Sequence, residues 1–325
     1  MTTASAADVS MIVPVRNEAE TLGDFLTSLL RQLPTPREIV LVDAGSTDGT
    51  GDILRRYTAA DGRLRVVEAE AAYPGRARNM AIGEAQGPWI AMTDAGTIVD
   101  EGWLRELTAT AAREPDAAAI LGTYEPLMRT FFDTCVALAF VAPGRSIDGR
   151  RFRGPSTASM MIRKQTWQEL GGFPEDLRAC EDLVFFERLE RRGYPVACAP
   201  RATVKWRIPG TFGALFQRFR AYSQHTLRAG RAHHWHRPVA WMYAAAAVAV
   251  VLAVAVHWIF ALVPVAGLIL RTHRSIEARR DIADSSNYAV VPIYAMTALI
   301  LVSIDIAALA GTLDFVRSRG RQTWS

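Results

Sequence analysis

The sequence predicts an α/β domain with a mostly parallel sheet, followed by helices that can cross a membrane. Short apolar runs alternate with segments of helical periodicity near the amino terminus, a pattern typical of βαβ units. The runs are apolar throughout, as the strands of a buried parallel sheet are. Two later stretches, 239–270 and 288–313, hold a single acidic or basic side chain between them. Both exceed the roughly 20 residues that one membrane crossing needs.

The elements of the α/β part are expected in strict alternation. The expected strands are 10–15 (SMIVPV), 38–43 (EIVLVD), 64–69 (LRVVEA) and 89–94 (WIAMTD). Helices are expected over about 19–32, 48–57 and 75–85. Asp43 and Asp94 each end a strand, and ligands of open α/β sheets bind at the carboxyl ends of strands. These two acids indicate a polar site, although the loop DAGSTDGT by itself is equally explained as turn and helix-cap chemistry.

Charge and cysteine usage indicate which partners the chain has. The net charge is +4, and basic residues crowd both sides of the first apolar stretch, in RFRAYSQHTLRAGRAHHWHR and RTHRSIEARR. Such segments usually face the cytoplasm and anionic lipid, so membrane lipid rather than nucleic acid is the expected partner. Cys135, Cys180 and Cys198 form no C-x-x-C pair, which argues against a disulfide framework or zinc site. The start lacks a secretory signal pattern, and we expect a multi-pass protein of the cell membrane with a cytoplasmic head.

Several motifs together resemble one enzyme family. IVPVRNEAETL, VDAGSTDGT, GRARNMAI and TDAG occur in this order, followed by GPSTASMMIRKQTWQELGGFPEDL and CEDLVFFERLERRGYPVACAP. The combination resembles the inverting nucleotide-sugar glycosyltransferases of family 2, which have the GT-A fold, over roughly residues 10–225. The resemblance implies a donor site for uridine or another nucleoside diphosphate, with Asp43 facing the base. Its residues would be Pro14, Glu18 and Asp43 for the nucleoside, and Arg76 or Arg78 near the base or diphosphate.

The chemistry of inverting transfer requires a base for the acceptor hydroxyl and a cation for the leaving diphosphate. The element CEDLVFF resembles the E-D element of the family, which implies Asp182 as the base and Glu181 as its neighbour. The alternative is that both are first-turn acids favoured by the helix dipole.

The cation site departs from the family pattern. Relatives carry D-x-D at the end of the fourth strand, whereas this chain has Asp94, Ala95 and Gly96, and Lys205 and Trp206 stand where many relatives have a histidine. Two hypotheses follow. Asp94 and phosphate oxygens hold a weakly bound magnesium or manganese ion, which we slightly favour, or Lys205 and nearby arginines neutralise the diphosphate.

The segment 209–238 is expected to form an amphipathic helix at the membrane surface. Phe212, Leu215, Phe216, Phe219 and Ser223 follow helical spacing. Polymer-making relatives carry Q-x-x-R-W here. Gln217 and Arg220 match this motif and are assigned to the donor site, while Ala221 replaces the tryptophan and weakens the case for a processive synthase.

The expected organisation is a GT-A domain over 1–208, the interface segment 209–238 and a membrane region over 239–325. Two or three spans are expected, at about 239–256, 258–270 and 289–313. Basic segments before and after the last span conflict with a single crossing between them. A tight hairpin followed by one further crossing or an in-plane helix is the working topology.

The two halves together predict transfer of a sugar to a lipid or lipid-linked glycan at the cytoplasmic membrane face. With a polyprenyl phosphate acceptor the nucleophile would need no base. The alternatives are a processive polysaccharide synthase, a binding-only relative without activity, and a nucleotidyltransferase, which would not need the E-D helix. The residues do not identify the sugar.

Overall fold

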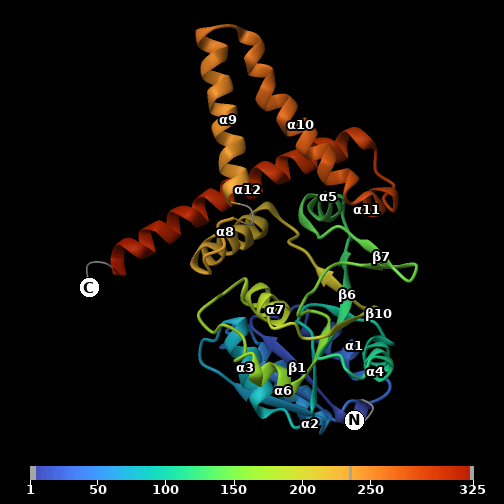
Figure 1. The fold of residues 1–325 in the computed structure, drawn as a ribbon. Coiled ribbons are helices and arrows are strands. Elements are labelled where there is room, and N and C mark those ends of the chain that lie inside the picture. The colour runs from blue at the N-terminus through green and yellow to red at the C-terminus, as the bar shows by residue number, and fades with distance from the viewer. Residues whose placement is uncertain (1–4, 234–235, 323–325) are drawn as a thin grey trace. The chain divides into compact units, whose positions relative to one another are not determined.

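The computed structural model describes residues 5–233 and 236–322, and side chains as far as residue 318. The chain divides into two compact units (Figure 1). Unit 1 comprises residues 1–127 and 144–207, and unit 2 comprises 128–143 and 208–325. Each unit is described by itself below.

Unit 1 contains an eight-stranded sheet with the order β3-β2-β1-β4-β9-β6-β10-β5. The strands are β1 (Val9–Val15), β2 (Glu38–Asp43), β3 (Leu64–Glu68), β4 (Trp89–Met92), β5 (Ile98–Val99), β6 (Ala119–Leu127), β9 (Met160–Arg163) and β10 (Val196–Arg207). Strands β3, β2, β1 and β4 are parallel, β9 is antiparallel to both neighbours, and β10 is parallel to β6. The short strands β7 (Arg145–Ile147) and β8 (Arg150–Phe152) pair separately. The predicted mostly parallel α/β sheet is confirmed.

Helices cover both faces of this sheet. They are α1 (Leu22–Leu30), α2 (Thr50–Ala60), α3 (Pro74–Glu84), α4 (Trp103–Arg113), α6 (Lys164–Glu169) and α7 (Glu181–Arg191), after a short turn η1 (Ala6–Asp8). Alternate residues of β1 enter two different cores, as the pleat requires. Met11 packs in the cluster that contains Phe25 of α1, whereas Ile12 packs in the cluster that contains Ala77 of α3.

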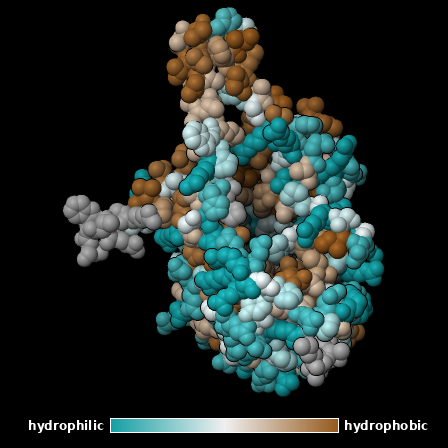
Figure 2. All heavy atoms as spheres, in the orientation of Figure 1, coloured by the Kyte–Doolittle hydropathy of each residue, from teal (hydrophilic) through white to brown (hydrophobic). Residues whose placement is uncertain are grey.

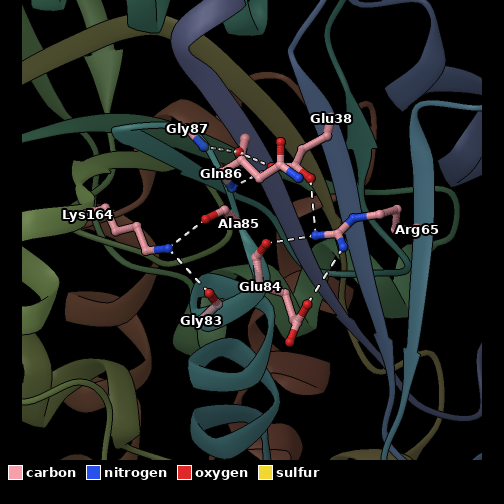
Figure 3. A network of polar contacts seen from close by, with 9 residues as sticks. Glu38, Arg65, Gly83, Glu84, Ala85, Gln86, Gly87 and Lys164 are labelled. Carbon is pink, nitrogen blue, oxygen red and sulfur yellow. Dashed lines mark hydrogen bonds and ion pairs between the residues drawn. The ribbon is translucent and has the colours of Figure 1, made fainter.

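A polar network fixes the carboxyl end of α3 to the opposite, amino-terminal edge of the strands (Figure 3). The buried Glu38 accepts from the backbone N–H of Gln86 at 2.6 Å and lies 3.2 Å from Arg65. Lys164 Nζ donates to the carbonyl of Ala85 at 2.6 Å, so a cation meets the negative end of the helix dipole. Because this end of α3 is fixed, the start of the helix has a defined place at the carboxyl edge.

Unit 2 is helical. It contains α5 (Phe131–Phe140), α8 (Phe212–Arg228), α9 (His236–Ala255), η2 (Trp258–Ala261), α10 (Leu262–Glu277), α11 (Arg280–Asp284) and α12 (Val290–Gln322). Helices α9 and α10 form a hairpin, and α12 packs on α8 and α5. Among the described residues, three helical segments are long and apolar enough to cross a membrane: His236–Ala255, Trp258–Glu277 and Val290–Ser318. Figure 2 shows hydrophobic side chains gathered on the hairpin.

Two features of unit 2 differ from the sequence-based expectation. The short apolar helix α5 was not predicted, and residues 128–143 group with the C-terminal helices rather than with the sheet. The apolar stripe of α8 was expected to face lipid, but this expectation is wrong for its central residues. Leu215 and Phe219 are buried, the ring of Phe219 lies 5.0 Å from that of Phe140, and Ser223 Oγ donates to Ala308 at 2.6 Å. Helices α5 and α12 therefore cover this face.

Candidate active site

Arg78 connects the end of β4 with the start of α7. Its side chain is buried, Nη2 donates to Asp94 Oδ1 at 2.6 Å, and Nη1 donates to Glu181 Oε1 at 2.6 Å. The guanidinium also lies over the ring of Phe173, 5.7 Å from its centroid. Three segments far apart in the sequence thus meet at one buried cation. Two of the predicted site carboxylates, Asp94 and Glu181, lie together for this reason, and Asp182 follows directly in the chain.

The local sequence explains how α3 and the loop before α7 approach so closely. Pro74 begins α3, a position where the missing N–H costs nothing. At Gly75 an added Cβ would lie 2.0 Å from the carbonyl oxygen of Pro174 and 3.4 Å from Glu181 Cβ. Glycine is therefore required at this position for backbone approach, and Arg78, one turn further on, reaches the start of α7.

Asn79 is a positioning residue that the sequence reasoning missed. Its Oδ1 accepts from the backbone N–H of Phe173 at 2.9 Å and from Trp167 Nε1 at 3.1 Å, and its Nδ2 donates to the carbonyl of Phe173. It thereby holds the turn that leads to Glu181. The sequence held one signal for this role. The two glycines of GGFPE mark a turn, and the motif GRARN offers a side chain, Asn79, that can hydrogen-bond to the backbone of that turn.

Glu181 and Asp182 occupy the first turn of α7, as the sequence predicts. The helix is preceded by Cys180 in the left-handed conformation, with φ 69°. The backbone N–H of Leu183 donates to Asp182 Oδ1 at 2.7 Å. Glu181 is buried beneath Arg78, whereas Asp182 is partly exposed. Of the two carboxylates, Asp182 is the one that solvent, and hence an acceptor, can reach.

The two acids differ electrostatically from ordinary carboxyl groups. Burial raises the pKa of Glu181 to about 7 against the opposing effect of Arg78, and the nearby Asp182 contributes to the rise. Burial also raises the pKa of Asp182, with Asp94 adding to the shift and Arg78 opposing it. The pKa of Arg78 itself is raised, because Asp94 and Glu181 outweigh the effect of burial. A carboxylate with a raised pKa is a stronger base near neutral pH.

The residues predicted to hold the nucleoside lie at the ends of β1 and β2. Pro14 pairs with Val42 across these parallel strands. Asp43 Oδ1 accepts from the backbone N–H of Ser46 at 3.0 Å, so this side chain stabilises the turn of the loop DAGSTDGT. Asp43 also lines a cavity of about 430 Å³ with residues of α2 and β3. Within residues 5–233 no hydrogen bond or ion pair joins Asp43 to the Arg78 cluster.

Gly96, which stands in the place of the second aspartate of the D-x-D pattern, has a backbone geometry that favours glycine. Its φ is +80°, and an added Cβ would lie 2.9 Å from Glu18 Oε2. That carboxylate is fixed by a 2.6 Å hydrogen bond from Thr21 Oγ1. The described residues contain no group of three or more His, Cys, Asp or Glu that could hold a metal ion. One carboxylate fits a magnesium ion that takes its other ligands from phosphate and water.

We expect Gly96→Ala to destabilise the protein by about 1–2 kcal/mol, because a side chain at positive φ is strained and would press on Glu18. Chemical denaturation of the purified chain measures the change. Gly83→Ala is the matched control, since this helical glycine has open space around it and alanine there should stabilise by up to about 1 kcal/mol. Equal effects of both substitutions on the free energy of unfolding would contradict the conclusion that the backbone at position 96 requires glycine.

Of the remaining predicted donor-site residues, Arg76 and Lys205 lie in unit 1 outside this cluster, and Gln217 and Arg220 belong to unit 2. Arg76 is exposed on α3, and Lys205 is exposed on β10 with its Nζ 3.8 Å from Asp100. Gln217 is exposed on α8 in unit 2, and Arg220 of the same helix donates to Asp314 at 2.6 Å. Their assignment to the donor site stays a prediction.

Comparison with known proteins agrees with the predicted family and fold. Residues 10–169 match the model of the family described as "Glycosyl transferase family 2". This match confirms the resemblance to the family 2 glycosyltransferases. The matched region includes Asp43, Arg78 and Asp94 and ends before α7.

This chain matches only part of the length of its curated relatives. Glycosyltransferase GlyG of Streptococcus pneumoniae serotype 4 is 34% identical over 117 residues, which are 36% of this chain and 38% of that protein. Glycosyltransferase AglE of Haloferax volcanii is 27% identical over 197 residues, 59% of this chain and 64% of that protein. The mannosyltransferase PcManGT of Pyrobaculum calidifontis, solved with GDP-Man and Mn²⁺, has a TM-score of 0.55 at 21% identity over 95% of this chain and 87% of that one. This likeness confirms the predicted GT-A fold.

Proposed function

We propose that this chain is a membrane-bound inverting glycosyltransferase that moves a hexosyl unit from a nucleoside diphosphate sugar to a lipid or lipid-linked glycan acceptor in cell-envelope glycan biosynthesis. The observation that carries the proposal is the Arg78 cluster, in which a buried guanidinium joins Asp94 to Glu181 at 2.6 Å each, with Asp182 partly exposed beside them. The family match of residues 10–169 supports the reaction class. The long apolar helices of unit 2 support a membrane acceptor.

The chemical step follows from these residues. The Asp182 carboxylate takes the proton of the acceptor hydroxyl as its oxygen attacks the anomeric carbon. The bond from that carbon to the diphosphate oxygen breaks with inversion, and the nucleoside diphosphate leaves with the electron pair. Glu181 and Arg78 hold α7 in place for this step. A divalent cation held by Asp94 and phosphate oxygens would neutralise the leaving group when bound.

Donor turnover by the full chain in nanodiscs tests the proposal. A panel of UDP-, GDP- and other nucleoside diphosphate sugars is offered with magnesium, manganese or excess chelator, and release of the nucleoside diphosphate is measured. We expect one donor to be turned over, and Asp94→Ala to lose this activity together with its metal response. Activity that survives chelator but is lost in Lys205→Ala would assign the cation role to Lys205. Binding without turnover, even with membrane-lipid acceptors, would indicate an inactive relative.

The size of the product distinguishes the second candidate, a processive synthase. A single added sugar supports the proposed reaction, and a polymer supports the synthase. If the acceptor is a polyprenyl phosphate, its phosphate oxygen attacks without a base. Comparison of lipid alcohol and lipid phosphate acceptors separates these two versions.

A further inference from the structure

The hairpin of α9 and α10 has one bare end and one basic end. At the tip, where α9 turns into α10, the apolar side chains are exposed, among them Val251, Val254, Val256 and Trp258. Each of the two spans of the hairpin is 20 residues long, about 30 Å of helix, which matches the hydrocarbon thickness of a bilayer. Arginines precede or begin α9 and end or follow α10: Arg228, Arg231, Arg237, Arg274, Arg279 and Arg280. The start of α9 and the end of α10, which together form the base of the hairpin, therefore both carry the residues that favour the cytoplasmic side.

Polar contacts tie α12 to the basic end of the hairpin. Asp305 accepts from Arg271 Nη2 at 2.9 Å and from the hydroxyl of Tyr243 at 2.8 Å. The hydroxyl of Tyr294 is hydrogen-bonded to His273 Nδ1 at 2.7 Å. Helices α9 and α10 both take part, and α12 meets them at two places along its length.

The spacing of these contacts fixes the direction of α12 relative to α10. Tyr294 and Asp305 are eleven residues apart, about 16 Å along α12. Their partners on α10, His273 and Arg271, are two residues apart, about 3 Å. Helices that ran side by side would have equal spacings. Helix α12 therefore crosses α10 steeply, and Figure 1 shows it running across the base of the hairpin.

The same contacts fix the depth of α12. Arg271 lies six residues before Glu277, the end of α10, which is about 9 Å of helix. Its partner Asp305 lies within one residue of the middle of the apolar segment Val290–Ser318. A third crossing would place this aspartate at the centre of the bilayer, where a charge is costly. The contact with Arg271 instead places the middle of α12 on the basic side of the bilayer, about 9 Å from the end of α10, which is the depth to which interfacial helices bury their apolar face.

Helix α12 has an exposed apolar face that suits this position. Leu299, Ile306, Leu309, Leu313 and Val316 recur at helical spacing and are all about half exposed or more. The opposite face is closed by α8, since an added Cβ on Gly311 would lie 2.2 Å from the carbonyl oxygen of Arg220. We infer that α12 lies along the bilayer surface at the base of the hairpin with this face in the acyl boundary, so that the chain crosses the membrane twice, at α9 and α10.

Cysteine accessibility tests this topology. Asn287→Cys before α12, Ser318→Cys near its end and Val256→Cys at the hairpin tip are labelled with an impermeant maleimide in vesicles of each orientation. The unmodified chain, with its three native cysteines, gives the background. We expect positions 287 and 318 to react from one side and position 256 from the other. Labelling of 287 and 318 from opposite sides would establish a third crossing, and labelling of all three from one side would exclude a crossing hairpin; either result overturns the inference.

Depth measurement provides a second, independent readout. A fluorophore at Leu299→Cys, Leu309→Cys or Val316→Cys should be quenched by lipid-bound quenchers at one shallow depth. On α9, Trp241→Cys and Val251→Cys should differ in depth by about 15 Å. A steady change of depth from 299 to 316 would overturn the in-plane assignment. Neither measurement depends on sugar transfer, so failure of the proposed reaction is distinguished from failure of this topology.

Discussion

Asp182→Asn is expected to lower kcat by about 10²–10⁴-fold, the usual effect of removing a general base. Asparagine has nearly the same shape but cannot take the acceptor proton. Donor affinity should stay within a few-fold of the original, because the carboxylate acts on the acceptor. Turnover with an alcohol acceptor and donor binding by calorimetry measure the two effects separately.

Asp176→Asn is the matched control, because this aspartate is exposed in the loop that precedes α7. It should leave both kcat and donor affinity unchanged. A change in kcat of less than about threefold in Asp182→Asn with an alcohol acceptor would exclude Asp182 as the base. The same small change with a lipid phosphate acceptor is the expected result, since a phosphate oxygen is already ionised.

The fold of unit 1 was predictable because its strands are short, apolar and separated by periodic helices. The strand expected over 38–43 is β2 without change, and the helix expected over 75–85 differs from α3 by one residue at each end. Helix α5 was missed because its ten residues are mostly apolar and show no clear helical period. Its place in unit 2 depends on long-range contacts, which a single sequence does not reveal.

The sequence predicted which acidic residues form the candidate site, but not which arginine they contact. Motif order brought Asp94, Glu181 and Asp182 into consideration, yet Arg76 and Arg78 could not be told apart. Residues two apart on a helix point about 200° apart, so one arginine of this pair is buried while the other is exposed. The choice is made by Gly75, which brings the loop before α7 onto the side of α3 where Arg78 lies.

Arg78→Met is expected to move the acidic limb of the pH–rate profile to higher pH. The guanidinium opposes the rise in pKa of both Glu181 and Asp182, so its removal raises these pKa values further. The base must be deprotonated to act, and a higher pKa therefore requires a higher pH for the same activity. At pH 7 we expect kcat/KM to fall by about 10²-fold or more, because the lost ion pairs also loosen α7.

The same substitution should make stability more dependent on pH. Carboxyl groups whose folded pKa lies above the unfolded value bind more protons when folded, so the free energy of unfolding falls as pH rises through that interval. Loss of one partner of a buried ion pair costs about 3–5 kcal/mol with Glu181 ionised, and less at pH 5, which lies below the raised pKa of Glu181. Arg78→Lys keeps the charge but not the two-pronged geometry, and should restore the pH limb without full activity. Arg76→Met, at an exposed position on α3, should change neither the acidic limb nor the pH dependence of stability. An unshifted limb in Arg78→Met would show that Arg78 does not tune the base.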